Sequence, residues 1–296
     1  MIIRKTGEDD LDGITDMYQD PTSYEPHIWK VYLEKEPDLG IVAELHGKIV
    51  GCIYAYPHHD TVWIESLYVH PEYRRRGIGE RLLKRAFSHI KRMGRKIALT
   101  DVRMDNASAI RLYKKVGFEN AYVRSHLVAG VDTLSSKVSD NLNFHKGYDF
   151  DILWSIIINS DAYLTRRGIV MGCYRGWRLM KEDLKDFEVF TDDGKSIIIF
   201  REVVDLELAP DIHGIFEKRY SDSKNVEGSC PRFEINLISG NYTDSKKLLS
   251  YVAKRAKKEG ANLIDIWTWR EDPLFKLYNE LNFENWGNLY LMERGL

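Results

Sequence analysis

The sequence predicts a mixed α/β fold that is built twice, in two tandem halves. Three observations lead to this prediction. Strand and helix patterns alternate through the first half. Within residues 67–79, a segment rich in arginine and glycine follows the end of a strand and leads into a helix. Part of the first-half pattern recurs after residue 240. At 296 residues the chain is long enough for two domains of ordinary size, each with its own core.

The first sixty residues predict a strand, two helices and a β-hairpin. The short strand is expected at residues 2–4, and a helix at residues 9–18 begins with acidic side chains, which suit the positive end of a helix dipole. A second helix is expected at residues 27–33. The hairpin has Gly47 in its turn and strands at residues 39–45 and 48–56.

The next seventy residues alternate strands with amphipathic helices. A strand at residues 61–69 ends at a proline, and apolar residues spaced three and four apart predict a helix from Ile78 to a stop at Gly94. Because this helix connects to a strand at residues 96–102, we expect the two strands to pair in parallel. A helix at residues 106–115 and a strand at 121–127 complete the half.

The second half repeats part of this order. The apolar helix face that begins at Leu82 recurs from Leu248 to a stop at Gly260, and residues 111–119 align with residues 276–284. Order and spacing both persist, which favours two copies of one unit over chance similarity. The predicted division is a first domain at residues 1–128, a linker region at 129–147 and a second domain at 148–296.

The segment between the strand and the helix is typical of phosphate binding. Glycines lack a Cβ atom, so successive N–H groups can turn toward an anion, and the helix start adds its positive dipole end. Arg74, Arg75 and Arg76 can supply charge-assisted hydrogen bonds. The aligned second-half segment, residues 240–245, has no arginine and places Asp244 beside any phosphate, so the anion site is expected only in the first half.

Composition limits the classes of partner. The net charge of −2 gives no basic field for nucleic acid or acidic membranes, and the longest mainly apolar stretch, residues 152–158, is too short to span a bilayer. Three separated cysteines without a CxxC pair predict no disulfide framework or zinc site and fit a cytoplasmic protein. The His58–His59 pair has no companion ligand in the sequence pattern, so no metal site is expected.

Two signatures resemble the GNAT acetyltransferase superfamily. One is Arg74-x-x-Gly77-x-Gly79 after a strand ending Leu67-Tyr68-Val69, and the other is Asn106-x-x-Ala109-x-x-Leu112-Tyr113-x-x-x-Gly117-Phe118. The resemblance covers residues 1–128 and, more weakly, the second half. It implies a central mixed sheet flanked by helices in each half and a working half paired with one that keeps only the fold. The fused copies would form a pseudo-dimer within one chain, while the oligomeric state stays open.

The resemblance also implies the chemistry. Acetyl-CoA would be the acyl donor and a primary amine the acceptor, either a protein or peptide N-terminus or a small amine, with direct transfer between them. The strand ending at Val69 would splay from its neighbour near a bulge, so that its N–H groups bind the pantetheine arm and polarise the thioester. The implied cofactor-binding residues are Leu67, Tyr68, Val69, Arg74, Arg75, Arg76, Gly77, Ile78, Gly79, Glu80, Asn106 and Tyr113.

Individual roles follow from the same resemblance. Arg74 would contact the nucleotide phosphates from the side or anchor the loop, and Asn106 would cap its helix and bond the pantetheine. Tyr113 would protonate the departing thiolate. Two carboxylates remain open as the base: Glu65, which regular alternation places on the face of Leu67 and Val69, and Asp101, on the adjacent strand. The alternative function is a non-catalytic acyl-CoA sensor.

Overall fold

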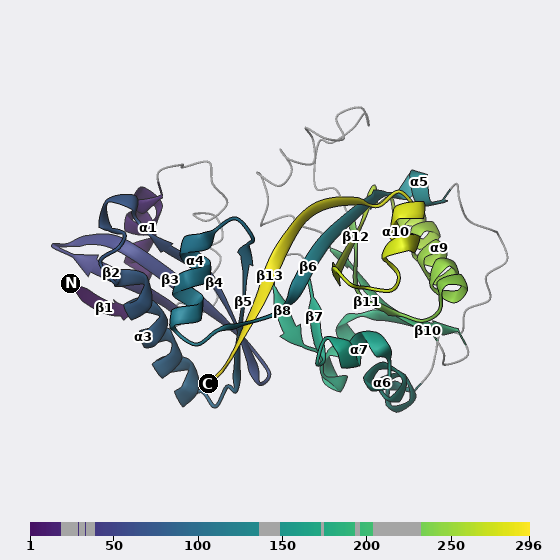
Figure 1. Cartoon of the computed structure of the whole chain (residues 1–296), viewed down its shortest axis with the longest axis horizontal. Helices are drawn as coiled ribbons and strands as arrows, with labels where there is room; N and C mark the ends of the chain where they lie inside the picture. The colour runs from purple at the N-terminus through teal and green to yellow at the C-terminus, as the bar shows by residue number, and fades with distance from the viewer. Residues whose placement is uncertain are drawn as a thin grey trace.

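The computed structural model describes residues 1–18, 29, 33, 39–135, 149–172, 175–192, 196–203 and 232–296 (Figure 1). The helix expected at residues 27–33 and most of the expected linker region lie outside the described residues. Among the described helices, none is both long and apolar enough to cross a membrane.

The first half follows the expected order of elements. Its helices and strands are β1 (Ile2–Lys5), α1 (Leu11–Met17), β2 (Gly40–Leu45), β3 (Lys48–His58), β4 (Thr61–Val69), η3 (Pro71–Tyr73), α3 (Ile78–Arg92), β5 (Ile97–Arg103), α4 (Ala107–Lys115), β6 (Glu119–Gly130) and α5 (Val131–Ser135). Strands β1 to β4 are antiparallel neighbours, whereas β4 and β5 pair in parallel across α3. The predicted parallel pair is therefore confirmed.

The second half adds a small hairpin and a similar crossover. Its elements are α6 (Phe150–Ile158), α7 (Asp161–Thr165), β7 (Ile169–Met171), β8 (Gly176–Arg178), η4 (Lys181–Asp186), β9 (Glu188–Asp192), β10 (Ser196–Val203), β11 (Arg232–Ser239), α9 (Tyr242–Lys258), β12 (Leu263–Trp269), α10 (Phe275–Glu280) and β13 (Glu284–Gly295). Strands β11 and β12 are parallel and are joined by α9. The succession β11-α9-β12-α10-β13 thus has the order of β4-α3-β5-α4-β6.

Within the described residues, the halves share one sheet of eleven strands because their last strands are exchanged. The order is β1-β2-β3-β4-β5-β13-β6-β12-β11-β10-β9, so β13 lies between β5 and β6, and β6 lies between β13 and β12. In Figure 1 these two long strands run between the two lobes. The predicted boundary at residue 128 falls inside β6, which ends at Gly130.

Helices cover both faces of the first-half sheet. The apolar face predicted for α3 is buried at Leu82, Leu83 and Ala86, and these residues pack with Val62 and Ile64 of β4. On the opposite face, α1 packs against Val42, Cys52 and Tyr54. Each fully buried leucine or isoleucine contributes about 1.5–3 kcal/mol, so this packing holds the first-half sheet between two helical layers.

Candidate active site

Strands β4 and β5 separate after a short parallel contact. They pair at only three positions, the last of which joins Trp63 to Leu99. Beyond it the Thr100 hydroxyl donates a hydrogen bond across the opening to the Ile64 carbonyl, at 2.9 Å. On the other side of β4 the register with β3 shifts next to Ser66, whose φ of 51° lies in the left-handed region. Ser66 is therefore the extra residue of a β-bulge, and β4 and β5 separate beside it.

The splay leaves backbone donors of β4 facing the gap. The His70 N–H donates to the Val50 carbonyl of β3, at 3.0 Å. Successive N–H groups of a strand point to opposite edges, so the N–H groups of Leu67 and Val69 face β5, while that of Tyr68 faces β3. Of the three predicted backbone contacts, two therefore have a donor directed into the gap.

The loop that follows β4 presents a row of unbonded amides. Among the described residues, no acceptor bonds the N–H groups from Arg75 to Glu80, and the helical ladder begins with Arg81 N–H donating to Gly77 O, at 3.1 Å. Arg75 and Gly77 have φ values of 63° and 76°, which curl the backbone. Six consecutive free donors at the start of a long helix can bind an anion such as a diphosphate.

Two residues hold this loop in place. The Arg74 Nε donates to the Val69 carbonyl at 2.8 Å and so anchors the loop, while its contact with the nucleotide phosphates stays a prediction. A Cβ atom on Gly79 would lie 3.0 Å from Leu112 Cδ2, and the absence of a side chain therefore lets α3 approach α4. Gly79 serves helix packing, whereas Gly77 serves backbone conformation.

Glu80 adds a carboxylate beside the loop, but two lysines offset its charge. Its carboxylate oxygens lie 2.6 Å from Lys115 Nζ and 2.8 Å from Lys84 Nζ. These hydrogen bonds, with Lys115 the stronger influence, lower the pKa of Glu80 to about 2. The phosphate contact of Glu80 therefore stays a prediction for its backbone N–H.

Asn106 and Tyr113 lie on α4 near the same opening. The Asn106 side chain caps α4 by accepting from the Ala109 N–H at 3.1 Å, which confirms its capping role. Tyr113 is buried, and its ring packs edge-on against Phe118 at 5.3 Å between centroids. Burial raises the pKa of Tyr113 to about 12, modulated by a hydrogen bond with Thr100 and by the nearby charge of Asp101.

The two candidate bases lie on the face opposite α3 and α4. Ala98 and Val102 of β5 pack with α3, so Asp101 alternates to the other face. Asp101 forms an ion pair with Arg124 of β6. Burial raises the pKa of Asp101, although the Arg124 charge acts in the opposite direction.

The prediction that Glu65 shares the face of Leu67 and Val69 is wrong. Glu65 is in register with Tyr54, which packs on the α1 side, whereas Leu67 and Val69 pack on the α3 side. The bulge at Ser66 inserts one residue and reverses the alternation. The Glu65 Oε1 atom instead lies 3.0 Å from Arg175 Nε, in the second half.

In the second half, Asn241 occupies the place of the phosphate loop. Its Oδ1 accepts from the Asp244 N–H at 3.0 Å, and its carbonyl accepts from the Ser245 N–H at 2.9 Å. Asn241 is thus the N-cap of α9. The aligned first-half amides, those of Ile78 and Gly79, have no such acceptor among the described residues.

A buried arginine fills the second-half splay. Strands β11 and β12 pair in parallel only as far as Ile235 and Ile266. Beyond that point Arg166 Nη1 donates to the Asn236 carbonyl at 3.1 Å and to the Trp267 carbonyl at 3.4 Å. Arg166 is 2% exposed. Its guanidinium therefore joins the two strands at the level where the first-half strands leave a gap.

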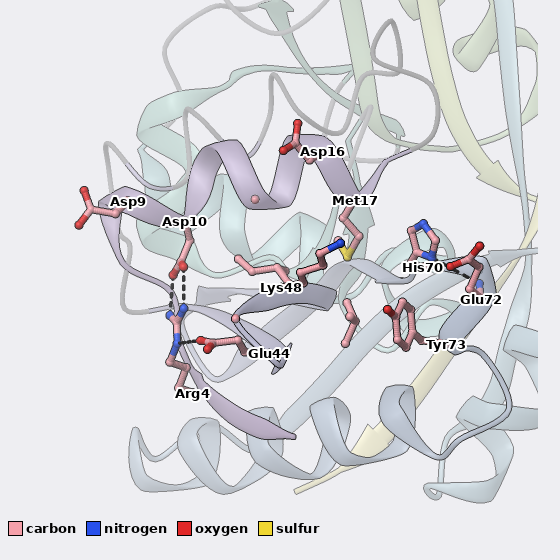
Figure 2. Close-up of a pocket in the computed structure, with 14 residues that line it drawn as sticks. Arg4, Asp9, Asp10, Asp16, Met17, Glu44, Lys48, His70, Glu72 and Tyr73 are labelled. Atoms are coloured by element: carbon pink, nitrogen blue, oxygen red, sulfur yellow. Dashed lines mark hydrogen bonds and ion pairs between the residues drawn. The ribbon is translucent and has the colours of Figure 1, made fainter.

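The structure also forms a pocket that the sequence did not indicate. It has a volume of about 440 Å³ and lies between α1, the β2–β3 turn and η3 (Figure 2). Arg4 crosses one end and donates to Asp10 at 2.7 Å and to Glu44 at 2.9 Å. The lining includes His70 and Glu72 but none of the candidate catalytic side chains. These lining residues are far apart in the sequence, so no local motif marks the pocket.

The expectation that the histidine pair lacks a companion ligand is wrong. Asp183, in η4 of the second half, places its Oδ1 atom 2.7 Å from His59 Nε2 and 3.2 Å from His58 Nε2. The contact spans more than 120 residues of sequence, which is why the local pattern did not show it.

Known proteins resemble both the first half and the whole fold. Residues 8–118 match the Acetyltransferase (GNAT) family. An uncharacterized N-acetyltransferase of Methanocaldococcus jannaschii is 32% identical over 127 residues, covering 40% of this chain and 79% of the relative. A second from the same organism is 30% identical over 139 residues, or 41% of this chain, and the match spans 62% of that relative's length.

Two further comparisons extend this likeness. The [ribosomal protein bS18]-alanine N-acetyltransferase of Escherichia coli is 32% identical over 87 residues, covering 29% of this chain and 59% of the relative. The crystal structure of a putative acetyltransferase from Pyrococcus horikoshii matches 100% of this chain and 89% of its own, with a TM-score of 0.56 at 15% identity, so both halves share its fold. The phosphate-type loop, the splayed strands and these matches together show that the chain belongs to the GNAT acetyltransferase family.

Proposed function

We propose that the chain is an acetyl-CoA-dependent N-acetyltransferase whose first half transfers an acetyl group directly to a primary amine. The observation that carries this proposal is the row of unbonded amides from Arg75 to Glu80, placed next to the gap between β4 and β5. A diphosphate bound to these amides would set the pantetheine arm along that gap, toward the free N–H groups of Leu67 and Val69.

The gap can activate a thioester without a metal or a covalent intermediate. When the amine attacks, the carbonyl oxygen gains negative charge, and a fixed N–H donor at that position stabilises the charge at once. A preorganised donor of this kind is worth about 3–4 kcal/mol, or several hundred-fold in rate. The N–H groups of Leu67 and Val69 are held by the bulge and by pairing with β3, so little reorganisation is needed.

The acid and base candidates lie on opposite faces of the opening, as the reaction requires. Tyr113 lies on the α3 and α4 side, where the thiolate would depart, and Asp101 and Glu65 lie on the other side, where the amine would enter. We favour Asp101 as the base because burial raises its pKa, which makes its carboxylate a stronger proton acceptor. Glu65, fixed by Arg175, would position the acceptor.

Tyr113 is better suited to donating a hydrogen bond than to transferring its proton. An ordinary thiol has a pKa of about 8.5, so full transfer from a phenol whose pKa is about 12 costs about 5 kcal/mol. A hydrogen bond to the developing thiolate avoids this cost and still stabilises the leaving group. We therefore propose that Tyr113 stabilises the thiolate by a hydrogen bond, while its role as general acid stays a prediction from the sequence.

The acceptor is an amine of one of two kinds. A protein or peptide N-terminus is supported by the likeness to the enzyme that acetylates ribosomal protein bS18, and a small amine fits the same chemistry. The entrance on the Asp101 side is built by both halves, since Arg175 and the β7–β8 hairpin come from the second. We propose that the second half shapes this entrance and binds no acetyl-CoA, which the Asn241 cap and the Arg166 bridge support.

A non-catalytic acyl-CoA sensor is the second candidate. One observation favours it: both carboxylates near the gap already form ion pairs, Asp101 with Arg124 and Glu65 with Arg175. A carboxylate held by a guanidinium is a weaker base, so binding without turnover is chemically consistent.

Thiol release from acetyl-CoA in the presence of pooled amines and peptides separates the two candidates. The proposed enzyme releases CoA thiol only when an acceptor is present, and the acetylated product appears in equal amount by mass spectrometry. Tight acetyl-CoA binding without turnover for any acceptor would instead establish the sensor.

A further inference from the structure

The tip of the β3–β4 hairpin meets the second half through three potential metal ligands. His58 ends β3, His59 is the first residue of the turn, and Asp183 lies in η4. The His58 Nε2, His59 Nε2 and one Asp183 carboxylate oxygen all lie within 4.8 Å of one another. Both imidazoles thus direct the same nitrogen atom toward a single carboxylate oxygen.

The spacing is close to that of a zinc site. With Zn–N and Zn–O bonds of about 2.0–2.1 Å, two ligands of a tetrahedral ion lie about 3.3 Å apart. The His58 Nε2 lies 3.2 Å from Asp183 Oδ1, and the His59 Nε2 lies 2.7 Å from it. A movement of about 0.6 Å in His59, which sits at an exposed turn, brings its distance from Asp183 Oδ1 to the tetrahedral value.

The neighbouring contacts fix the orientation of these ligands. The second oxygen of Asp183 accepts from the Met180 N–H at 2.8 Å, so Oδ1 remains directed at the two imidazoles. The His58 ring packs edge-on against Trp177, at 5.5 Å between centroids. Outer contacts of this kind are what orient the ligands of natural metal sites.

The backbone at His59 adds an independent observation. Its φ of 45° lies in the left-handed region, where a two-residue hairpin turn normally uses asparagine, aspartate or glycine. Histidine is enriched at such positions relative to most other non-glycine residues, and the His59 ring packs edge-on against that of His58, at 4.5 Å between centroids. Metal binding would account for the choice of an imidazole here.

We propose that His58, His59 and Asp183 bind one divalent transition-metal ion, with Zn²⁺ the best match, and that this ion fastens the first-half hairpin to the second half. Two imidazoles and one carboxylate are ligands that zinc prefers, and three protein ligands leave a fourth position for water. None of the three residues belongs to the proposed acetyl-transfer site, so this inference does not depend on that function.

Isothermal titration of the full chain with zinc chloride tests the proposal. The protein is prepared without a polyhistidine tag and is stripped with a chelator before titration. We expect one ion per chain, bound with a Kd of about 1 μM or tighter, and a higher melting temperature in its presence. Cobalt(II) added in place of zinc should give the visible absorption of a tetrahedral nitrogen and oxygen site.

Matched variants show whether these residues are the ligands. His59→Asn keeps a side chain that tolerates a left-handed φ, and Asp183→Asn keeps an acceptor for the Met180 N–H. Each should weaken zinc binding at least about 100-fold, since even the loss of an outer-shell partner costs 10–100-fold. His46→Asn, at an exposed turn with a φ of 51°, is the control and should leave zinc binding unchanged.

Two results would overturn the proposal. One is the absence of saturable zinc binding by the wild-type chain, which would leave the cluster as a hydrogen bond from His59 to Asp183 beside a close contact of His58. The other is zinc binding of equal strength in wild type and His59→Asn. Because His59 lies in an exposed turn, the second comparison stands even if Asp183→Asn fails to fold.

Discussion

Replacing Tyr113 by phenylalanine removes one hydroxyl and keeps the ring. The loss of a hydrogen bond to the departing thiolate should cost about 1.5–3 kcal/mol, which lowers kcat roughly 10- to 150-fold. Stability should fall by about 1 kcal/mol or less, because the ring still packs on Phe118 and Thr100 keeps its bond to the Ile64 carbonyl. The Kd for acetyl-CoA should stay within about threefold of the wild-type value, since the proposed diphosphate site lies at the amides from Arg75 to Glu80 and not at Tyr113.

Tyr278 provides the matched control in the second half. It is fully buried, and its hydroxyl donates to Asp272 Oδ2 at 3.2 Å. Tyr278→Phe should lower the free energy of unfolding by about 1.5–3 kcal/mol and leave kcat unchanged. For both variants, urea denaturation measures the free energy of unfolding, titration with acetyl-CoA measures its Kd, and initial rates of thiol release measure kcat.

The outcomes distinguish the roles sharply. A loss of kcat beyond about 1,000-fold in Tyr113→Phe would mean full proton transfer and would refute the hydrogen-bond role. An unchanged kcat would remove Tyr113 from the mechanism. Equal effects of the two variants on rate would contradict a single active half.

Three further variants test the site and the second half. Gly77→Asp should weaken acetyl-CoA binding roughly 15-fold more than Gly77→Asn, because a unit charge about 5 Å from a doubly charged diphosphate costs about 1.7 kcal/mol in water; equal affinities by calorimetry would argue against a phosphate there. Asp101→Asn should lower kcat/KM and remove its rise with pH. Only the ionised carboxylate accepts a proton, and burial raises the pKa of Asp101. The kcat/KM of the wild type should therefore increase as the pH rises through the pKa of Asp101. A variant with the pH profile of the wild type would exclude Asp101 as the base. Arg166→Met should lower the free energy of unfolding, measured with urea, by about 3 kcal/mol or more, since it removes the donor to two backbone carbonyls. Turnover per folded molecule should stay unchanged. A drop in turnover would give Arg166 a role in the reaction.

Local chemistry made the phosphate loop predictable from the sequence. Its glycines, arginines and following helix lie within one short segment, and the structure shows the left-handed φ at Gly77 and the free amides that this pattern implies. The parallel pairing of β4 and β5 was equally accessible, because a connecting helix leaves few alternatives.

Features that depend on an irregular strand or on distant contacts were not accessible. Counting alternate residues placed Glu65 on the wrong face, since no sequence pattern revealed the bulge at Ser66. The partner of the histidine pair, Asp183, and the partners of Arg166 lie in other parts of the chain. The exchange of β6 and β13 was hidden for a similar reason, because a strand has the same apolar pattern whichever neighbour it pairs with.

Backbone amide spectra of isotope-labelled protein, recorded with and without coenzyme A, test the central claim most directly. The account predicts that the N–H resonances from Arg75 to Glu80 shift strongly and become protected from hydrogen exchange, while those of Thr243 to Lys246 at the start of α9 stay in place. Unchanged resonances at Arg75 to Glu80, or equal shifts at both helix starts, would contradict it.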